Sequence, residues 1–239
     1  MVPTVLMTLA LVFAPVDGLP TEQQVLPSVG TDSVIEGSGI EEVREELKKA
    51  EIIPTVIDDF VPLLSLDVKW SKKSYASLGN TLKPKKLQDS PTVTLEGPEA
   101  STDICSSNTQ LVVTLTDPDA PSRDDPKWSE MCHWIAAGVS ASAELDLSTG
   151  RCPAVTVTKL DEIMPYKAPG PPEKTGKHRY VFLVFAPANG TTDELHLSKP
   201  KDREHWGYDG KGHGVRDWAQ DNGLVPVAAN FIYAQNKKQ

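Results

Sequence analysis

The run Tyr180-Val181-Phe182-Leu183-Val184-Phe185 decides the fold of this 239-residue chain. Successive side chains of a strand point to opposite faces, and in this run both alternating sets are apolar. A strand that is apolar on both faces has to be covered on both faces. The run therefore predicts the central strand of a sheet.

Short apolar runs separated by Pro, Gly and polar turns lie on either side of this strand. Their length and their content of β-branched and aromatic residues suit strands better than helices. Several such runs in one chain are typical of an all-β sandwich or barrel. We therefore expect a mostly β fold, an antiparallel β-sandwich with peripheral helices, whose other strands are residues 64–70, 92–96, 111–116, 133–139, 155–159 and 226–233.

Two segments have helical rather than strand spacing. Over residues 40–51, apolar residues recur every three or four positions among Glu and Lys, which predicts an amphipathic helix that ends before Pro54. Its apolar stripe is expected to pack on the sheet. A second helix is expected around residues 215–221, just before the last strand.

The N-terminal residues differ in composition from the rest of the chain. Residues 5–13 are an apolar run, too short for a bilayer, which needs roughly 20 apolar residues, and Gly18 offers a small residue for cleavage. We expect residues 1–18 to be a signal peptide, residues 19–38 a flexible N-terminus and residues 39–239 one domain. A cleaved signal peptide implies a secreted protein, or one that reaches a vacuole through the secretory pathway. Since no Lys or Arg precedes the apolar run, a mitochondrial or uncleaved segment stays open as the alternative.

Cysteine usage and one sequon add to this expectation. Three cysteines are an odd number, so at most one internal disulfide can form. Cys105 and Cys152 lie in polar, loop-like sequence whereas Cys132 lies in an apolar strand pattern, which favours a Cys105–Cys152 pair. In the secretory pathway Asn189, in Asn189-Gly190-Thr191, is expected to carry a glycan.

The charge of the chain excludes one class of partner. Its formal net charge is −9 at pH 7, whereas proteins that bind the phosphate backbone of nucleic acids do so chiefly through Lys and Arg. We therefore expect no nucleic-acid partner.

Two carboxylates follow the strand expected over residues 111–116. The odd positions of that strand share one face, so Asp117 continues its core-facing side. Pro118 and Pro121 restrict the backbone on either side of Asp119. The sequence thus predicts two carboxylates held in one rigid turn.

Two histidines lie at the beginnings of other strands. His133 opens the strand that follows the acidic turn, and His178 shares a strand face with Tyr180 because the two are two positions apart. If the strands are antiparallel neighbours, the imidazoles meet the carboxylates. A nearby carboxylate favours imidazolium, whose N–H groups donate to phosphate oxygens, and the acidic pair can receive an ammonium group. The pattern predicts a site for a small anion that carries phosphate oxygens, with phosphate affinity that falls as pH rises through the histidine range.

At these residues the chain resembles the phosphatidylethanolamine-binding protein family. The resemblance extends from about Leu64 to Tyr233, and the features Gly170-Pro171-Pro172 and Trp206-Gly207-Tyr208 are similar to the fungal carboxypeptidase-inhibitor branch. Its two main motifs are Asp117-Pro118-Asp119-Ala120-Pro121-Ser122-Arg123 and Gly176-Lys177-His178-Arg179-Tyr180, with Trp128-Ser129-Glu130 leading to His133 between them.

The resemblance implies a β-sandwich with a shallow head-group pocket, without catalysis, cofactor or metal. It also implies a serine carboxypeptidase as a candidate protein partner. Arg123 and Arg179 are expected to brace carboxylates or loops rather than contact ligand. The pocket residues that it implies are Asp117, Asp119, His133, Pro172, His178 and Tyr180, with Tyr166 as a looser candidate.

Four other interpretations stay open at the level of sequence. Asp-Pro is a common turn starter, so the two aspartates could only shape a turn. Two His and two Asp are ordinary zinc ligands, although the chain has no His-x-x-x-His or Cys-x-x-Cys pair. A hydrolase could use Cys132 and His133, but adjacent residues of a strand point to opposite faces. The fourth is a pure lipid-binding scaffold.

Overall fold

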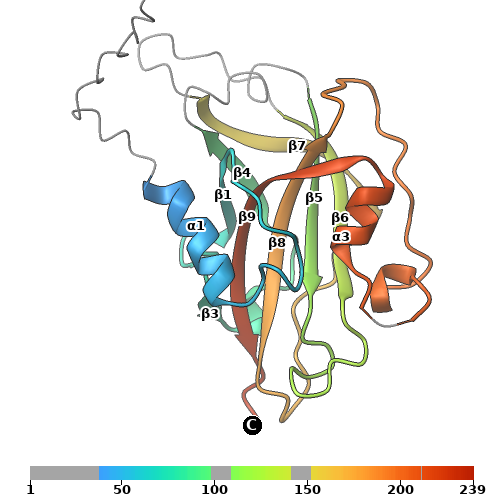
Figure 1. The fold of residues 1–239 in the computed structure, drawn as a ribbon. Helices are drawn as coiled ribbons and strands as arrows, with labels where there is room; N and C mark the ends of the chain where they lie inside the picture. The colour runs from blue at the N-terminus through green and yellow to red at the C-terminus, as the bar shows by residue number, and fades with distance from the viewer. Residues whose placement is uncertain (1–37, 98–108, 141–151, 211) are drawn as a thin grey trace, which may run out of the picture. The chain divides into compact units, whose positions relative to one another are not determined.

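The computed structural model describes residues 38–97, 109–140, 152–210 and 212–239, which belong to one compact unit, Glu36–Gln239 (Figure 1). Within these residues nine strands form one sheet in the order β2-β1-β4-β7-β6-β5-β8-β9-β3. Neighbouring strands are antiparallel except β3 and β9, which run parallel. The strands are β1 (Ser65–Ser71), β2 (Ser74–Tyr75), β3 (Asn80–Leu82), β4 (Thr92–Gly97), β5 (Gln110–Asp117), β6 (Met131–Ser140), β7 (Cys152–Met164), β8 (Lys177–Pro187) and β9 (Leu224–Gln235).

The predicted mostly β, antiparallel character is confirmed, but the strands form one continuous sheet rather than two separate ones. β7 is longer than the predicted run and pairs with β4 through its first residues and with β6 through its last. One core cluster joins side chains of β1, β4 and β7 with side chains of β5, β6, β8 and β9. The sheet therefore folds back on itself and encloses this first core.

The predicted central strand lies within β8, between β5 and β9. All six side chains of the run 180–185 are at most 1% exposed. Tyr180, Phe182 and Val184 face the first core, and the alternate three residues face a second core on the other side of the sheet. The prediction of a strand covered on both faces is confirmed.

Helices cover the second core. α1 (Ser38–Lys49) contributes Val43 and Leu47, and α3 (Val215–Asp221) contributes Val215 and Trp218, to a cluster with buried side chains of β5, β8 and β9. Burying one such apolar side chain stabilises the fold by about 1.5–3 kcal/mol. Both predicted helices are confirmed, as is the packing of the first on the sheet. The described residues also form two short 3-10 turns, η1 (Pro84–Lys86) and η3 (Glu204–Gly207).

Several predictions fall outside the described residues. These are the signal peptide, most of the flexible N-terminus, and the side chains of Cys105 and Cys152. Cys132 is a free, buried thiol, and burial raises its pKa to about 12. Asn189 is exposed in the turn after β8, so its glycosylation stays a prediction. In the described part of the chain, no helix has both the length and the apolar character needed to cross a membrane.

Candidate functional site

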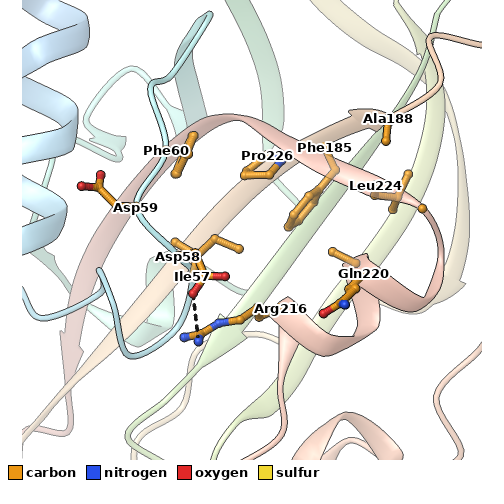
Figure 2. A pocket seen from close by; sticks show the side chains of 12 residues that line it. Ile57, Asp58, Asp59, Phe60, Phe185, Ala188, Arg216, Gln220, Leu224 and Pro226 are labelled. Atoms are coloured by element: carbon orange, nitrogen blue, oxygen red, sulfur yellow. Dashed lines mark ion pairs between the residues drawn. The ribbon is translucent and has the colours of Figure 1, made fainter.

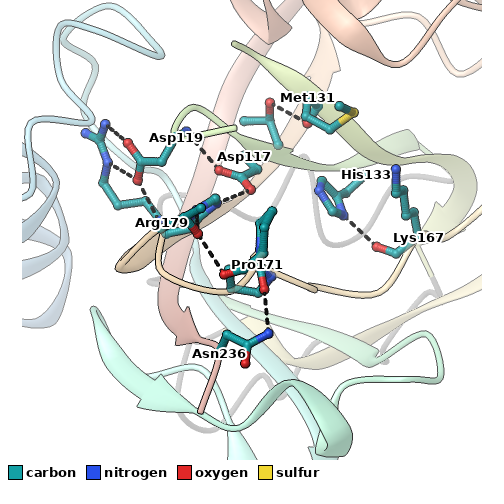
Figure 3. A network of polar contacts seen from close by, with 12 residues as sticks. Asp117, Asp119, Met131, His133, Lys167, Pro171, Arg179 and Asn236 are labelled. Carbon is teal, nitrogen blue, oxygen red and sulfur yellow. Dashed lines mark hydrogen bonds and ion pairs between the residues drawn. The ribbon is translucent and has the colours of Figure 1, made fainter. Parts of the chain in front are cut away.

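Asp117 is the last residue of β5 and lies at the centre of a polar cluster (Figure 3). The Asp117 side chain accepts a hydrogen bond from Nδ1 of His178 at 2.9 Å and another from the backbone N–H of Asp119 at 2.8 Å. It is only 2% exposed. One carboxylate thus shapes the turn that follows β5 and also pairs with a histidine of β8.

His178 has partners on both ring nitrogens. The Thr175 hydroxyl donates to the Pro172 carbonyl at 2.9 Å, which leaves its oxygen to accept from Nε2 of His178 at 3.0 Å. With Nδ1 facing the Asp117 carboxylate, each ring nitrogen of His178 has a hydrogen-bond partner. Since both nitrogens are engaged, His178 orients Asp117 and has no N–H left for an anion.

Tyr180 lies between the two histidines. Its ring stacks on His178 with the ring centres 6.3 Å apart, and it meets His133 edge-on at 5.2 Å. Burial, and after it the Asp117 carboxylate, raises the pKa of Tyr180 well above its ordinary value. The tyrosine therefore remains a neutral phenol and forms a wall shared by both imidazoles.

His133 is neutral, which contradicts the expectation of two charged imidazoles. Its Nδ1 lies 2.7 Å from the Lys167 carbonyl, so Nδ1 carries the proton and donates (Figure 3). Burial lowers the pKa of His133 to about 4, although the Asp117 charge acts in the opposite direction. Nε2 has no hydrogen-bond partner among the described residues and is an acceptor. The expected fall in phosphate affinity through the histidine range therefore has no basis at this residue.

Asp119 is engaged by Arg179 rather than open to a ligand. The guanidinium donates to both carboxylate oxygens, at 2.7 and 3.0 Å, and the Arg179 backbone N–H donates at 2.7 Å. Arg179 also donates to the carbonyls of Ala50 and Glu51 at the end of α1. This confirms that Arg179 braces a carboxylate, and Arg123 likewise pairs with Glu51 at 2.5 Å.

The remaining two predicted residues lie at the margin of the cluster. Pro172 is exposed and takes part through its carbonyl, which accepts from Thr175. Tyr166 donates its hydroxyl to the Leu87 carbonyl at 2.9 Å and accepts from Trp70 at 3.2 Å, and burial raises its pKa to about 12. The Tyr166 hydroxyl is thus engaged by Leu87 and Trp70 rather than by a residue of the predicted site.

Two cationic residues that the sequence did not single out lie near His133. Lys167 and Arg203 both act to lower the pKa of His133, as smaller contributions than burial. Lys167 is exposed, whereas Arg203 is half-buried and donates to backbone carbonyls. Neither follows from strand alternation, because both lie in loops that only the folded chain brings to β6.

Glu130 is a further buried acid, and its burial could not be predicted from the sequence. Its carboxylate accepts from the Thr116 hydroxyl at 2.9 Å and from the Val215 backbone N–H at 3.4 Å. Burial raises the pKa of Glu130 to about 7. It faces α3 rather than Asp117, so we assign it to the fold and not to the site.

A cavity of about 520 Å³ lies apart from this cluster (Figure 2). Phe185 and Leu224 line its apolar part, and an ion pair between Arg216 and Asp58, at 3.0 Å, lies at its edge. It contains none of the residues predicted for the head-group pocket.

Comparison with known proteins defines the class to which this fold and cluster belong. A family model described as phosphatidylethanolamine-binding protein matches residues 72–232. The chain belongs to the phosphatidylethanolamine-binding protein family.

Individual relatives match over most of their length. The carboxypeptidase Y inhibitor of Saccharomyces cerevisiae is 33% identical over 208 residues, which cover 81% of this chain and 94% of that protein. CEN-like protein 1 of Nicotiana tabacum is 31% identical over 196 residues, which cover 82% and 94%. A crystal structure of carboxypeptidase Y inhibitor complexed with the cognate proteinase aligns with a TM-score of 0.71 at 31% identity, and covers 83% of this chain and 97% of that one.

Proposed function

We propose that this protein binds a zwitterionic phospholipid head group at the Asp117 cluster and catalyses no reaction there. The observation that supports this is the meeting of β5, β6 and β8 at one point, which brings Asp117, His133 and Tyr180 together. Asp117 and His133 are 2% and 4% exposed, so only a small group can reach them. An ammonium group fits, because it can donate to the carboxylate and to Nε2 of neutral His133.

The phosphate of such a head group lies outside the cluster, near the cationic Lys167. In this arrangement Asp117, His133 and Tyr180 contact the ligand and His178 orients Asp117. Asp119 and Pro172 shape the walls, and Tyr166 supports them from further away. Hydrolysis with Cys132 as the nucleophile is disfavoured because Cys132 faces the second core, whereas Tyr180, whose ring contacts both histidines, faces the first.

Replacing Asp117 with asparagine is expected to weaken binding of glycerophosphoethanolamine about tenfold or more, because a charge-assisted hydrogen bond contributes about 1.5–3 kcal/mol. Isothermal titration calorimetry at pH 7 measures this, with His196→Ala, an exposed histidine, as the control variant. Circular dichroism has to show that both variants are folded. Wild-type affinity retained by folded Asp117→Asn, or no heat from wild-type protein at millimolar ligand, would contradict the proposal.

The same titration repeated across pH tests the role of neutral His133. Affinity is expected to stay level from pH 8 to 6 and to fall as the pH approaches the His133 pKa of about 4. Protonated Nε2 can no longer accept from an ammonium group and repels it. Glycerophosphoethanolamine is suitable because its phosphodiester keeps one charge over this range. A loss of affinity as pH rises from 6 to 8 would instead support anion binding by imidazolium.

We also infer that the protein inhibits a serine carboxypeptidase. The similarity to carboxypeptidase Y inhibitor over most of both chains supports this, as does the alignment with its complex with a proteinase. The chain starting at residue 19 is expected to inhibit peptide hydrolysis by carboxypeptidase Y, and Asp117→Asn to inhibit equally well if the pocket is a separate site. A carboxypeptidase that stays fully active at micromolar concentrations of the protein would rule this out. A partner of this kind agrees with the proposed route to the secretory pathway or vacuole.

A further inference from the structure

His133 lies at an irregularity of the sheet. Leu115 of β5 is paired with Trp134 of β6, but the next residue, Thr116, is paired with Cys132, so His133 is an extra residue in the register. Such a bulge re-aims a side chain, and the ladder with β5 does not fix its direction. Other contacts therefore have to hold His133 against Tyr180.

The contacts that hold His133 come from two loops. The Lys167 backbone N–H donates to the His133 carbonyl at 2.7 Å, and the ring Nδ1 donates back to the Lys167 carbonyl at 2.7 Å. The Arg203 guanidinium donates to the carbonyls of Cys132, His133 and Pro165 at 3.1, 3.2 and 2.8 Å. The planar guanidinium of Arg203 thus connects the bulge at His133 to the segment of Pro165 and Lys167, whose Lys167 carbonyl accepts from the imidazole.

The backbone around Arg203 is itself anchored to the strand ends of the site. The Arg203 carbonyl accepts from the Cys132 N–H at 2.7 Å, and Nδ1 of His205 lies 2.6 Å from the Ser129 carbonyl. The buried Trp206 donates to the Thr116 hydroxyl at 2.9 Å. His205 and Trp206 have φ values of 51° and 53°, a left-handed conformation that non-glycine residues keep only where surrounding contacts impose it.

We propose that Arg203 is the positioning residue of the head-group site, which aims His133 by clamping the bulge to the segment carrying Lys167. This rests on the proposed function for the use of the site, but the aiming of His133 can be measured without ligand. Arginine suits the role because its fixed fork reaches several acceptors at once, whereas lysine provides a single ammonium group. Arg203 does not touch the ligand.

The test is NMR of the His133 imidazole in wild type, Arg203→Met and Arg203→Lys. Wild type is expected to show the Nδ1–H tautomer and a pKa of about 4, with Asp117, Lys167 and Arg203 as the charged groups that face the ring. In both variants the tautomer preference is expected to be lost, since Lys keeps the charge but not the fork. In Arg203→Met the titration also moves to higher pH. Affinity for glycerophosphoethanolamine falls about tenfold in both.

Arg216→Met is the matched control, because Arg216 is also half-buried and also donates to a backbone carbonyl, that of Pro54, outside the site. It is expected to leave the His133 signals unchanged. Folded Arg203→Met or Arg203→Lys with wild-type His133 signals would overturn the proposal. If wild type binds no glycerophosphoethanolamine, the proposed function fails, while the His133 signals still decide the role of Arg203.

Discussion

Arg179→Met is expected to destabilise the fold by about 3–5 kcal/mol, because it leaves the Asp119 carboxylate buried without its partner. The side chains of this pair are only 7% and 1% exposed. The substitution also removes the donors to the carbonyls of Ala50 and Glu51, which tie the end of α1 to the acidic turn. Chemical unfolding at pH 7, followed by tryptophan fluorescence, measures the change.

Two companion variants show whether the lost partner is the cause. Arg123→Met, which removes a solvent-exposed pair with Glu51, is expected to cost no more than about 1 kcal/mol. Arg179→Met combined with Asp119→Leu is expected to recover part of the loss, because it removes the unpaired charge. A double variant less stable than Arg179→Met alone, or an Arg179→Met loss as small as that of Arg123→Met, would show that the buried pair does not dominate.

Glu130→Gln is expected to make the protein sensitive to acid. Burial raises the pKa of Glu130 from its ordinary 4.5 to about 7, so between these values the folded protein binds a proton that the unfolded chain has released. Its folded state therefore gains stability as the pH falls. Burial lowers the pKa of His133 from 6.5 to about 4, so there the unfolded chain binds the extra proton and the folded state loses stability. From pH 6.5 to 4.5 the two effects oppose each other.

Each shift corresponds to about 3 kcal/mol. In Glu130→Gln, nothing compensates the stability that the folded state loses through His133 as the pH falls. Between pH 7 and 4.5 the free energy of unfolding of the variant is therefore expected to fall by about 3 kcal/mol relative to that of wild type. Taking the difference from wild type removes the contribution of other titrating groups. Denaturant unfolding at a series of pH values tests this, and His133→Phe is expected to change in the opposite direction. Parallel curves for Glu130→Gln and wild type would contradict the assignment for Glu130, and parallel curves for His133→Phe and wild type would contradict the assignment for His133.

Strand alternation predicted the parts of the fold and site that depend on local direction. It identified β8 as central and placed Asp117 on the core-facing side of β5, and the antiparallel pairing of β5 with β6 and β8 is observed. It could not predict the bulge at His133, because a bulge depends on the register between two strands.

The charge states of the buried groups also could not be predicted from the sequence. The neutral form of His133 and the raised pKa of Glu130 follow from burial by segments remote in the chain. Likewise, Asp117 and Asp119 are equivalent in the motif but differ in the structure, since Arg179 engages only the second. The family resemblance implied the set of residues, and the contacts show which of them are engaged by protein partners, as Asp119 is by Arg179.

The two outermost strands of the sheet limit how the protein can associate. In the described residues the order ends at β2 and β3, which are two and three residues long. An incoming extended peptide would find few backbone donors and acceptors there, so growth of the sheet by strand addition is disfavoured. A protease that binds this protein is therefore expected to recognise its loops and side chains rather than to add a strand to the sheet.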